Sequence, residues 1–366
     1  MNIQRNNRIL KSLVTALLAL PLLGSALFAN AADAPLPKSV RIAAVAYFDN
    51  NKPTYIDSSA VVAEQGWLDS ELKKRGVALE WVPAPHTNVG PVINEGFANQ
   101  SIDFAGYGDL PSIILNAGGV DTRVLVPTGR GMDTFLVVPR DSTAKSIKDL
   151  VGKRIAIHRG RPWEVPFIRL LEANGLSYKD FKILNINPVA GAAALAANEV
   201  DAIYTLNDAY LLEDRQVGRI IWSTKSAPAD WRMRAELWGS KVFIDRYPEL
   251  TQLVATAFVK AAYWSSQPQN EDALVKIRTR SGAPESVIRR EYQDGVAWKD
   301  RWSPLFDDYV AAHYQHTADY ALDKKLIRRP VDAKQLIDAR FAAQALRDLR
   351  IEGYWAPEAG DAKAAR

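Results

Sequence analysis

The chain has 366 residues, enough for two domains of ordinary size, and 48% of them are hydrophobic. It contains no cysteine, which excludes disulfides, thiolate nucleophiles, cysteine-based metal sites and the lipid attachment of a lipoprotein. The formal net charge is +4, but residues 1–31 carry three basic and no acidic side chains, so residues 32–366 have a net charge of only +1. These residues contain no basic, aromatic-rich run that would bind nucleic acid.

The first residues have the pattern of a secretory signal. Arg5, Arg8 and Lys11 precede an apolar run at 13–23, and Ala29-Asn30-Ala31 supplies the small residues that a signal peptidase recognises. The apolar run is shorter than the roughly 20 residues of a membrane-spanning helix, although an uncleaved anchor is the alternative. We therefore expect cleavage after Ala31 and a non-lipidated mature chain in the periplasm.

Strand-like and helix-like segments alternate after this leader. The first strand is expected at 40–48 and the first helix at 58–75, where Asp57 or Ser58 fits the N-cap and Gly76 ends the pattern. Further strands of this block are expected at 77–82, 102–105 and 122–127, and further helices at 89–99 and 110–116. This alternation predicts a parallel sheet covered by helices.

A second block repeats the alternation. Its strands are expected at 135–138, 154–158, 182–186, 201–206 and 218–224, and its helices at 147–150, 162–174, 190–198 and 209–213. A short apolar run at 242–244 is interpreted as leading the chain back to the first block. The rest is helical in pattern, in pieces near 249–265, 269–280, 284–294, 303–321 and 332–350, before a disordered tail at 358–366.

The predicted fold class is therefore α/β with two lobes. We assign 1–31 to the signal peptide, 32–132 and 240–366 to lobe 1, and 133–239 to lobe 2, with crossings near 130–138 and 224–242. Both blocks contain a similar phrase, in which a helix end is followed by a short strand that opens with Asp103 in one block and Asp201 in the other. Two similarly built lobes would produce such a repeat.

Ligands of open parallel α/β sheets bind outside the carboxyl ends of the strands, where helix N-termini also point. Loops at 48–54, 106–111, 158–163 and 205–208 occupy such positions. The loop at 158–163 carries the clearest signal for an anion, since Gly160 permits close backbone approach and Arg161 can hold an oxyanion with two parallel hydrogen bonds. The alternative for this loop is an ordinary strand–helix turn with a solvated arginine.

The other loops supply weaker candidates. Asp109 fits a helix N-cap better than a contact to an anion, which it would repel. Arg130 is either a charge partner of the ligand or an ordinary surface residue, and the larger aromatic side chains form either an apolar wall or plain core. The candidate ligand-binding residues are Phe48, Asn50, Gly108, Asp109, Leu110, Arg130, Gly160, Arg161, Trp163, Asn207, Asp208 and Trp238.

No cofactor, metal site or catalytic residue is expected. His313 and His316 lie three residues apart on a predicted helix, but the sequence offers no third metal ligand beside them. Neither a phosphate-binding loop, a dinucleotide-binding fingerprint nor a nucleophile elbow occurs in the chain.

Five phrases follow one another in an informative order. They are Ala63-Glu64-Gln65-Gly66-Trp67-Leu68, Gly108-Asp109-Leu110-Pro111, Asp149-Leu150-Val151-Gly152-Lys153-Arg154-Ile155-Ala156, Leu171-Glu172-Ala173-Asn174-Gly175-Leu176 and Val200-Asp201-Ala202. By this order and spacing, residues from about 39 to about 290 resemble the nitrate/taurine/aliphatic-sulfonate family of periplasmic binding proteins. The resemblance implies a two-lobe type II periplasmic-binding-protein fold with two interlobe crossings and a cleft that closes on its ligand.

The binding loops depart from the family pattern. The family often has Gly-Ser-Ser where this chain has Gly160-Arg161-Pro162-Trp163, a threonine in place of Leu110, and Trp-Asp-Pro where this chain has Leu206-Asn207-Asp208-Ala209. The loss of hydroxyls and the gain of an arginine indicate a different or bulkier anion than a simple alkanesulfonate.

The resemblance implies the solute-binding component of an ABC importer. Its ligand would be a small organic anion, namely an aliphatic or aryl sulfonate or a sulfate ester, and its partners a permease and an ATPase at the inner membrane. The protein is expected to be a monomer. The alternatives are nitrate or a thiamine-pyrimidine precursor as the ligand, or an enzyme on the same fold; the related enzyme depends on a cysteine-rich motif that this chain lacks.

Overall fold

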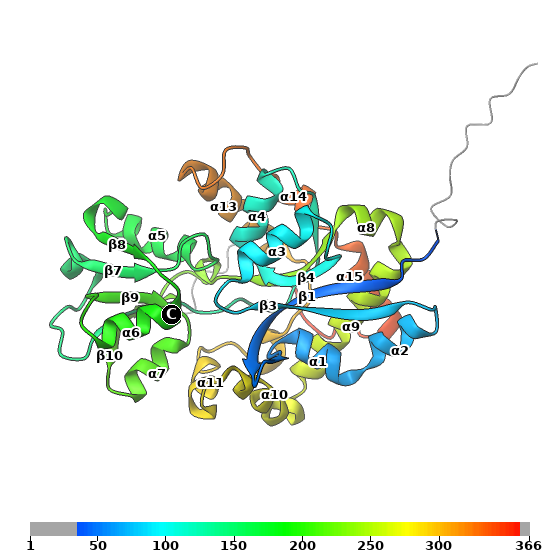
Figure 1. Ribbon diagram of the computed structural model, residues 1–366, viewed down its shortest axis with the longest axis horizontal. Coiled ribbons are helices and arrows are strands. Elements are labelled where there is room, and N and C mark those ends of the chain that lie inside the picture. The colour runs from blue at the N-terminus through cyan, green and yellow to red at the C-terminus, as the bar shows by residue number, and fades with distance from the viewer. Residues whose placement is uncertain (1–34, 359–366) are drawn as a thin grey trace, which may run out of the picture. The chain divides into compact units, whose positions relative to one another are not determined.

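The computed structural model describes residues 35–358, which form two lobes, each built around its own β-sheet (Figure 1). This arrangement agrees with the expected two-lobe α/β fold. The signal peptide expected at 1–31 and nearly all of the tail expected at 358–366 lie outside the described residues. Within 35–358, no helix has the length and apolar character needed to cross a membrane.

The first lobe contains a six-stranded sheet in the order β2-β1-β4-β11-β5, with β3 paired to β1. The strands are β1 (Ser39–Asp49), β2 (Lys52–Thr54), β3 (Ala78–Pro85), β4 (Phe104–Gly108), β5 (Thr122–Val126) and β11 (Ala235–Ser240). Because β1 runs parallel to both β3 and β4, these three strands place their carboxyl ends at one edge of the sheet.

Helices cover both faces of the first sheet, and each face has its own apolar core. One face carries α3 (Val89–Ala98), α4 (Asp109–Ala117), α13 (Asp308–Asp323) and α14 (Ala333–Leu336). The other face carries α1 (Ser58–Gln65), α2 (Trp67–Lys73), α8 (Lys241–Arg246), α9 (Pro248–Ser266), α10 (Glu271–Arg278) and α15 (Arg340–Leu349). A four-residue helix, α12 (Trp298–Arg301), contacts α9.

The second lobe contains a five-stranded sheet in the order β10-β6-β9-β7-β8. The strands are β6 (Phe135–Pro139), β7 (Arg154–Ile157), β8 (Lys182–Asn185), β9 (Ala202–Thr205) and β10 (Gly218–Ser223). Helix α5 (Glu164–Ala173) lies on one face, and α6 (Pro188–Ala196) and α7 (Asp208–Asp214) lie on the other (Figure 1). Since β7 is parallel to β8 and β9, their carboxyl ends also share one edge.

The repeated phrase noted in the sequence has the same structural role in both lobes. In the first lobe, Asp103 accepts hydrogen bonds from the backbone N–H, Nε and Nη2 of Arg41, over 2.6–3.0 Å. In the second lobe, Asp201 accepts the same three bonds from Arg154, over 2.8–3.1 Å. Each aspartate thus connects the entry of one strand to the entry of its neighbour, and the two lobes are built alike.

Several predicted elements differ from the structure. The helix expected at 58–75 is two helices, because Gly66 adopts a left-handed conformation (φ +63°) that ends α1. The chain returns to the first block earlier than expected, through β11, which pairs with β4 and β5, and the apolar run at 242–244 belongs to the following helix α8. Residues 235–239, assigned to lobe 2 from the sequence, therefore lie in the first sheet.

The C-terminal helices also do not all belong to the first lobe. Helix α11 (Glu285–Glu291) packs against α7, and Val287 is buried in the core of the second lobe. Arg290 forms ion pairs with Glu213 and Asp214 of the second lobe. The chain therefore crosses to the second lobe a further time after α10.

The two crossings between the sheets, at 127–134 and 224–234, are joined to each other. Met132 and Met233 form a backbone bridge, and the backbone N–H of Thr134 donates to Oγ1 of Thr224 at 2.9 Å. Asp133 accepts hydrogen bonds from Thr224 Oγ1 at 2.8 Å and from Arg232 Nε at 3.1 Å. The connection is thus a paired ribbon rather than two independent linkers.

Candidate functional site

The candidate site lies where the strand-end loops of the two lobes face each other. In the first lobe, Tyr47 near the end of β1 and His86 after β3 stack their rings, with centroids 4.4 Å apart and planes inclined by 11°. Gly108 ends the neighbouring β4. In the second lobe, the loop at 158–163 follows β7, and 206–207 follows the adjacent β9. Parallel strand order therefore brings each set of loops to one edge.

The facing loops are in contact. Nη2 of Arg161 donates a hydrogen bond to the carbonyl oxygen of Thr87 in the first lobe, at 3.3 Å. A Cβ on Gly90 would lie 3.0 Å from Nη1 of Arg161, and a Cβ on Gly108 would overlap Cγ of Pro162. The two lobes are therefore in direct contact at these loops, and glycine occupies two of the contact positions.

Arg161 is a buried cation without a carboxylate partner. Its residue is only 4% exposed, and no carboxylate oxygen among residues 35–358 lies within 4.0 Å of its guanidinium. Its hydrogen bonds go to neutral acceptors, Nδ1 of His158 at 3.3 Å and the carbonyl of Thr87. Desolvation lowers the pKa of Arg161 to about 10, so the side chain stays charged at neutral pH and its charge is uncompensated.

Two neutral donors lie beside this guanidinium. Burial, together with the positive charge of Arg161, lowers the pKa of His158 to about 4, so the imidazole is neutral. Because its Nδ1 accepts from Arg161, its proton lies on Nε2. Trp163 is 8% exposed, its indole N–H has no partner within the described residues, and its ring centroid lies 6.0 Å from the guanidinium carbon. Such a group of donors suits an oxyanion.

Acidic side chains lie on the other side of the same junction. Asp208, the first residue of α7, accepts a hydrogen bond from Oγ1 of Thr205 at 3.4 Å. Its negative charge favours higher pKa values for His86 and Tyr47 of the first lobe. Asp208 is exposed to water, yet surrounding protein desolvates its carboxyl and raises its pKa. Asp57 shows the same combination. Both carboxyls therefore lie close to other protein groups while they keep contact with water.

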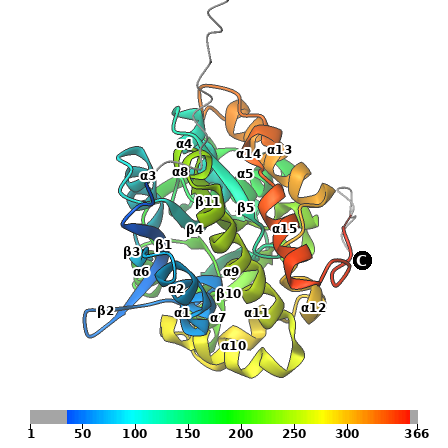
Figure 2. The same ribbon diagram turned by 90° about the vertical axis from the view of Figure 1, so that its right-hand side faces the viewer.

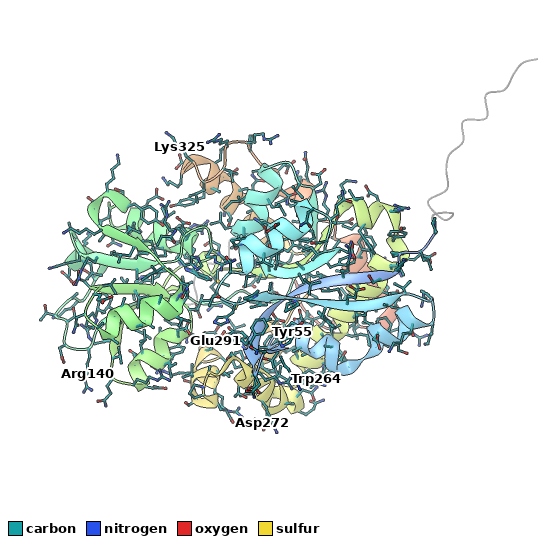
Figure 3. The ribbon with its side chains drawn as sticks, in the orientation of Figure 1. Tyr55, Arg140, Trp264, Asp272, Glu291 and Lys325 are labelled. Carbon is teal, nitrogen blue, oxygen red and sulfur yellow. The ribbon has the colours of Figure 1, made fainter. Side chains whose placement is uncertain are left out.

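Helices α10 and α11 place two charged side chains, Arg278 and Glu291, beside Asn207 of the second lobe. Asn207 donates a hydrogen bond to Oε2 of Glu291 at 2.9 Å, and Glu291 forms an ion pair with Arg278 at 3.1 Å. Figure 3 shows Glu291 beside the second lobe, at the level where the two lobes face each other. The charge of Glu291 is therefore compensated within the protein.

Four of the predicted site residues point into the first lobe or the crossings. Asp109 is buried and accepts from Nε2–H of His313 at 2.7 Å and from the backbone N–H of Arg234 at 3.1 Å. Arg130 pairs with Asp307 at 2.7 Å. Leu110 and Trp238 are fully buried in the apolar core. These four side chains are buried or already paired within the protein, and their contact with a ligand stays a prediction.

The remaining predicted residues divide between the junction and its margin. Phe48 is 51% exposed and belongs, with Asn50, to the β1–β2 hairpin, which Figure 2 shows extending away from the first sheet. Gly160 donates its backbone N–H to Glu164. The structure brings together Gly108, Arg161, Trp163, Asn207 and Asp208 near the facing loops, and whether they bind a ligand stays a prediction.

Sequence reasoning missed most of the first-lobe side of the site. Tyr47 and His86 directly flank the carboxyl ends of two paired strands, which is a positional signal that the sequence contained. Thr87 contacts Arg161 only through its backbone carbonyl oxygen, and every residue type carries such a group, so the sequence could not identify this contact. Arg278 and Glu291 come from helices that the sequence placed far from the second lobe.

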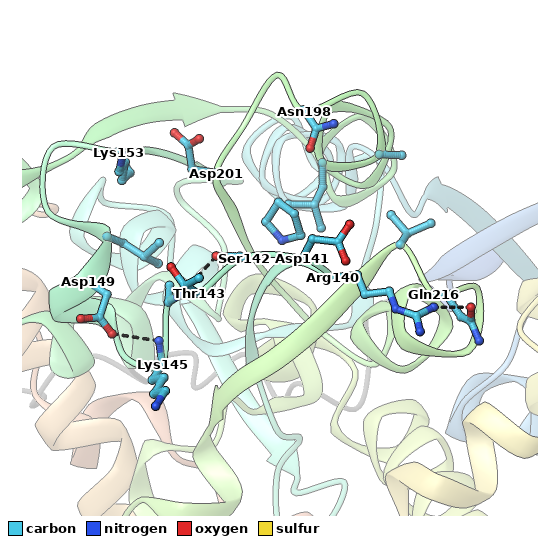
Figure 4. A pocket seen from close by; sticks show the side chains of 16 residues that line it. Arg140, Asp141, Ser142, Thr143, Lys145, Asp149, Lys153, Asn198, Asp201 and Gln216 are labelled. Atoms are coloured by element: carbon cyan, nitrogen blue, oxygen red, sulfur yellow. Dashed lines mark hydrogen bonds between the residues drawn. The ribbon is translucent and has the colours of Figure 1, made fainter.

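A separate open groove of about 880 Å³ lies at the opposite end of the second lobe (Figure 4). Lys153 and Asp201 line it, directly before β7 and β9, so it lies at the amino ends of the strands rather than the carboxyl ends. Two of its three acids are already paired, Asp201 with Arg154 and Asp149 with backbone amides. Among residues 35–358, no cluster of three metal-ligating side chains occurs.

Comparison with known families decides the classification. The model of the family described as NMT1/THI5 like matches residues 68–271, more than half of the chain. The chain belongs to the NMT1/THI5-like family. A solved structure from Methylobacillus flagellatus KT, assigned the name periplasmic sulfonate-binding protein SsuA, is 48% identical over 88% of this chain and 98% of its own, with a TM-score of 0.79. This likeness confirms the type II periplasmic-binding-protein fold expected from the sequence.

Two more distant similarities also extend over most of the chain. A Bacillus subtilis (strain 168) protein assigned as an aliphatic sulfonates-binding protein is 24% identical over 290 residues, covering 79% of this chain and 84% of its own. The desulfurization enzyme DszB superimposes with a TM-score of 0.65 at 18% identity, covering 86% of this chain and all of its own. The fold of this chain is therefore shared with an enzyme as well as with binding proteins.

Proposed function

We propose that this protein is the periplasmic solute-binding component of an ABC importer and captures an organic sulfonate between its two lobes. The observation that carries the proposal is Arg161, a buried cation without a carboxylate partner where the facing loops meet. The 48% identity to a protein named as a periplasmic sulfonate-binding protein supports the ligand class. A signal peptide ending at Ala31, release to the periplasm, and a permease with its ATPase as partners belong to the same proposal.

The chemistry of a sulfonate matches this group of donors. A sulfonate carries one negative charge over three oxygens and stays ionised throughout the physiological pH range. Arg161 offers N–H groups in a planar fork, and the indole N–H of Trp163 and the Nε2–H of His158 are neutral donors beside it. A bound sulfonate would compensate the charge of Arg161 in surroundings that exclude water, where an ion pair is stronger than in bulk solvent.

Binding would join the lobes through contacts that each lobe supplies in part. Arg161 belongs to the second lobe, whereas Thr87 and the Tyr47–His86 stack belong to the first. The paired ribbon of the two crossings is the element about which the lobes would open and close. We propose that the closed, ligand-bound form binds to the permease. We also propose that the protein delivers its ligand chemically unchanged and acts as a monomer.

Titration calorimetry on the purified protein tests this proposal. The panel is propane-1-sulfonate, benzenesulfonate, propyl sulfate, nitrate and a thiamine-pyrimidine precursor, in buffers without a sulfonate group. We expect sulfonates to bind, and Arg161→Met to weaken their binding more than tenfold while the melting temperature of the unliganded protein stays equal or rises, because an unpaired buried charge is removed. Arg140→Met, an exposed arginine of the same lobe, is the control. Tight binding of the pyrimidine alone, or sulfonate binding unchanged by Arg161→Met, would contradict the proposal.

A further inference from the structure

Met132 and Met233 face each other where the two crossings between the sheets are paired. The backbone N–H of Met132 donates to the carbonyl oxygen of Met233 at 2.8 Å, and the backbone N–H of Met233 donates to the carbonyl oxygen of Met132 at 3.1 Å. Residues that exchange both backbone hydrogen bonds lie directly opposite each other in an antiparallel pair, with their side chains on the same face. The two thioether side chains are therefore neighbours.

These two residues are the only methionines of the chain after Met1, and the chain has no cysteine. Thioethers are therefore the only sulfur groups that an oxidant can reach in the folded part of this protein. Met132 is partly exposed to water, whereas Met233 is only 5% exposed. Met132 is thus the more accessible member of the pair.

Both side chains belong to the apolar core of the second lobe. Met233 is buried in this core together with Trp163, and Met132, Trp222 and Trp231 pack against it. Trp163 also belongs to the candidate site, in the loop that follows β7. The methionine pair therefore joins the ribbon of the two crossings to the core that supports this loop.

The backbone beside the pair is closely packed. Gly131 has a left-handed conformation (φ +87°), and a Cβ at this position would lie 2.9 Å from the carbonyl oxygen of Met233. On the other side of Met132, Asp133 accepts hydrogen bonds from Thr224 and Arg232 of the second crossing. Any change that separates the two methionines therefore also separates the two crossings.

We propose that Met132 and Met233 form an oxidation-sensitive modification site in the ribbon between the lobes. Hydrogen peroxide transfers one oxygen atom to a thioether sulfur: the O–O bond breaks, an S–O bond forms, and the other oxygen leaves as water with both hydrogens. The sulfur loses two electrons, and the peroxide gains them. Methionine sulfoxide reductases return the sulfoxide to the thioether, so the modification is reversible.

This modification site goes beyond the proposed function, because it concerns how the lobes are joined and not which ligand they hold. Oxidation converts a flexible apolar side chain into a polar one. Burial of the new S–O group without a hydrogen-bond donor costs free energy. Since Met233 is buried in an apolar core, its sulfoxide favours states in which the ribbon is open to water. The oxidised protein is therefore less stable and holds its lobes together less tightly.

Peroxide treatment of the purified protein, followed by peptide mass spectrometry, tests the proposal. We expect Met132 to gain an oxygen atom at lower peroxide concentrations than Met233, because Met132 is more exposed. Once both are oxidised, the melting temperature should fall by about 3 °C or more, and the affinity for propane-1-sulfonate by about fivefold or more. Reductases for both sulfoxide epimers should restore both properties.

Leucine variants supply the control, because leucine keeps a similar apolar volume and has no oxidisable sulfur. Met132→Leu/Met233→Leu should bind propane-1-sulfonate as the unaltered protein does, and peroxide should change neither its melting temperature nor its affinity. Val151→Met, added to this double variant, places one methionine at an exposed position of the same lobe away from the crossings. Oxidation of this added side chain should also change neither property.

Four outcomes would overturn the proposal. The first is that Met132 and Met233 resist peroxide concentrations that oxidise the added side chain of Val151→Met. The second is that both are oxidised without a change in melting temperature or affinity. The third is that the losses persist in the double leucine variant, and the fourth is that the reductases cannot reverse them. The melting temperature requires no ligand, so a failure of sulfonate binding contradicts the proposed function and leaves this test intact.

Discussion

Asp103 holds Arg41 through three hydrogen bonds, and the Asp201–Arg154 pair repeats this arrangement in the second lobe. The two pairs differ in burial. The side chains of Arg41 and Asp103 are 32% and 5% exposed, against 41% and 33% for Arg154 and Asp201. The same contact therefore operates in two environments within one chain.

This difference predicts unequal stability effects. Asp103→Ala leaves a backbone N–H and a guanidinium unpaired beside a buried strand entry, and we expect it to lower the free energy of unfolding by about 2–3 kcal/mol. Asp201→Ala removes a more solvated pair and is expected to cost about 1 kcal/mol. Urea unfolding at pH 7 measures both. Equal losses, or a larger loss for Asp201→Ala, would show that burial does not decide the strength of this contact.

The close approach of Gly108 to Pro162 predicts a steric effect on ligand capture. Alanine suits the backbone of residue 108, whose φ is −76°, but its Cβ would overlap the Pro162 ring. We expect Gly108→Ala to hold the lobes apart and weaken sulfonate binding at least tenfold with little change in stability. Gly106→Ala is the matched control on the same strand, since its Cβ would meet only Oγ of Ser59 at an ordinary 3.4 Å. Unchanged affinity for Gly108→Ala would mean that the ligand binds without this contact.

The buried side chain of His313 leads us to predict that the free energy of unfolding depends on pH. Burial lowers the pKa of His313 in the folded protein, whereas the unfolded chain has a histidine pKa near 6.5. As the pH falls below about 6.5, the unfolded chain takes up a proton that the folded protein does not, and the free energy of unfolding decreases by up to about 1.4 kcal/mol per pH unit for this group.

Variants at two positions of α13 isolate this effect. His313→Gln should reduce the loss of stability between pH 7.5 and pH 5, measured by urea unfolding. His316→Gln, an exposed position one turn further along, serves as the control for the same helix. If both variants retain the full pH dependence of the unaltered protein, the acid sensitivity arises at other groups.

Local sequence patterns determined most of the elements and the fold class. Alternating strand and helix patterns identified the strands that carry the site loops, and the loop at 158–163 was recognised because Gly160, Arg161 and Trp163 are chemically distinctive. The pattern failed at Gly66, where the left-handed backbone divides one expected helix into two. It also failed at β11, whose sequence Ala-Glu-Leu-Trp-Gly-Ser has no clear alternation and which becomes a strand by pairing on both sides.

Tertiary structure alone decided which charged residues have partners. The sequence shows Arg130 and Arg161 as equivalent arginines, but folding places Asp307 against the first and no carboxylate within ion-pair distance of the second among residues 35–358. Likewise, Asp109 and Asp208 both begin helices, and only the first is enclosed by donors. Local patterns specify strands and helices because they depend on near neighbours. Whether a charged side chain is compensated depends on residues distant in the chain. The sequence could therefore indicate candidate site residues, but it could not separate side chains available to a ligand from side chains already paired within the protein.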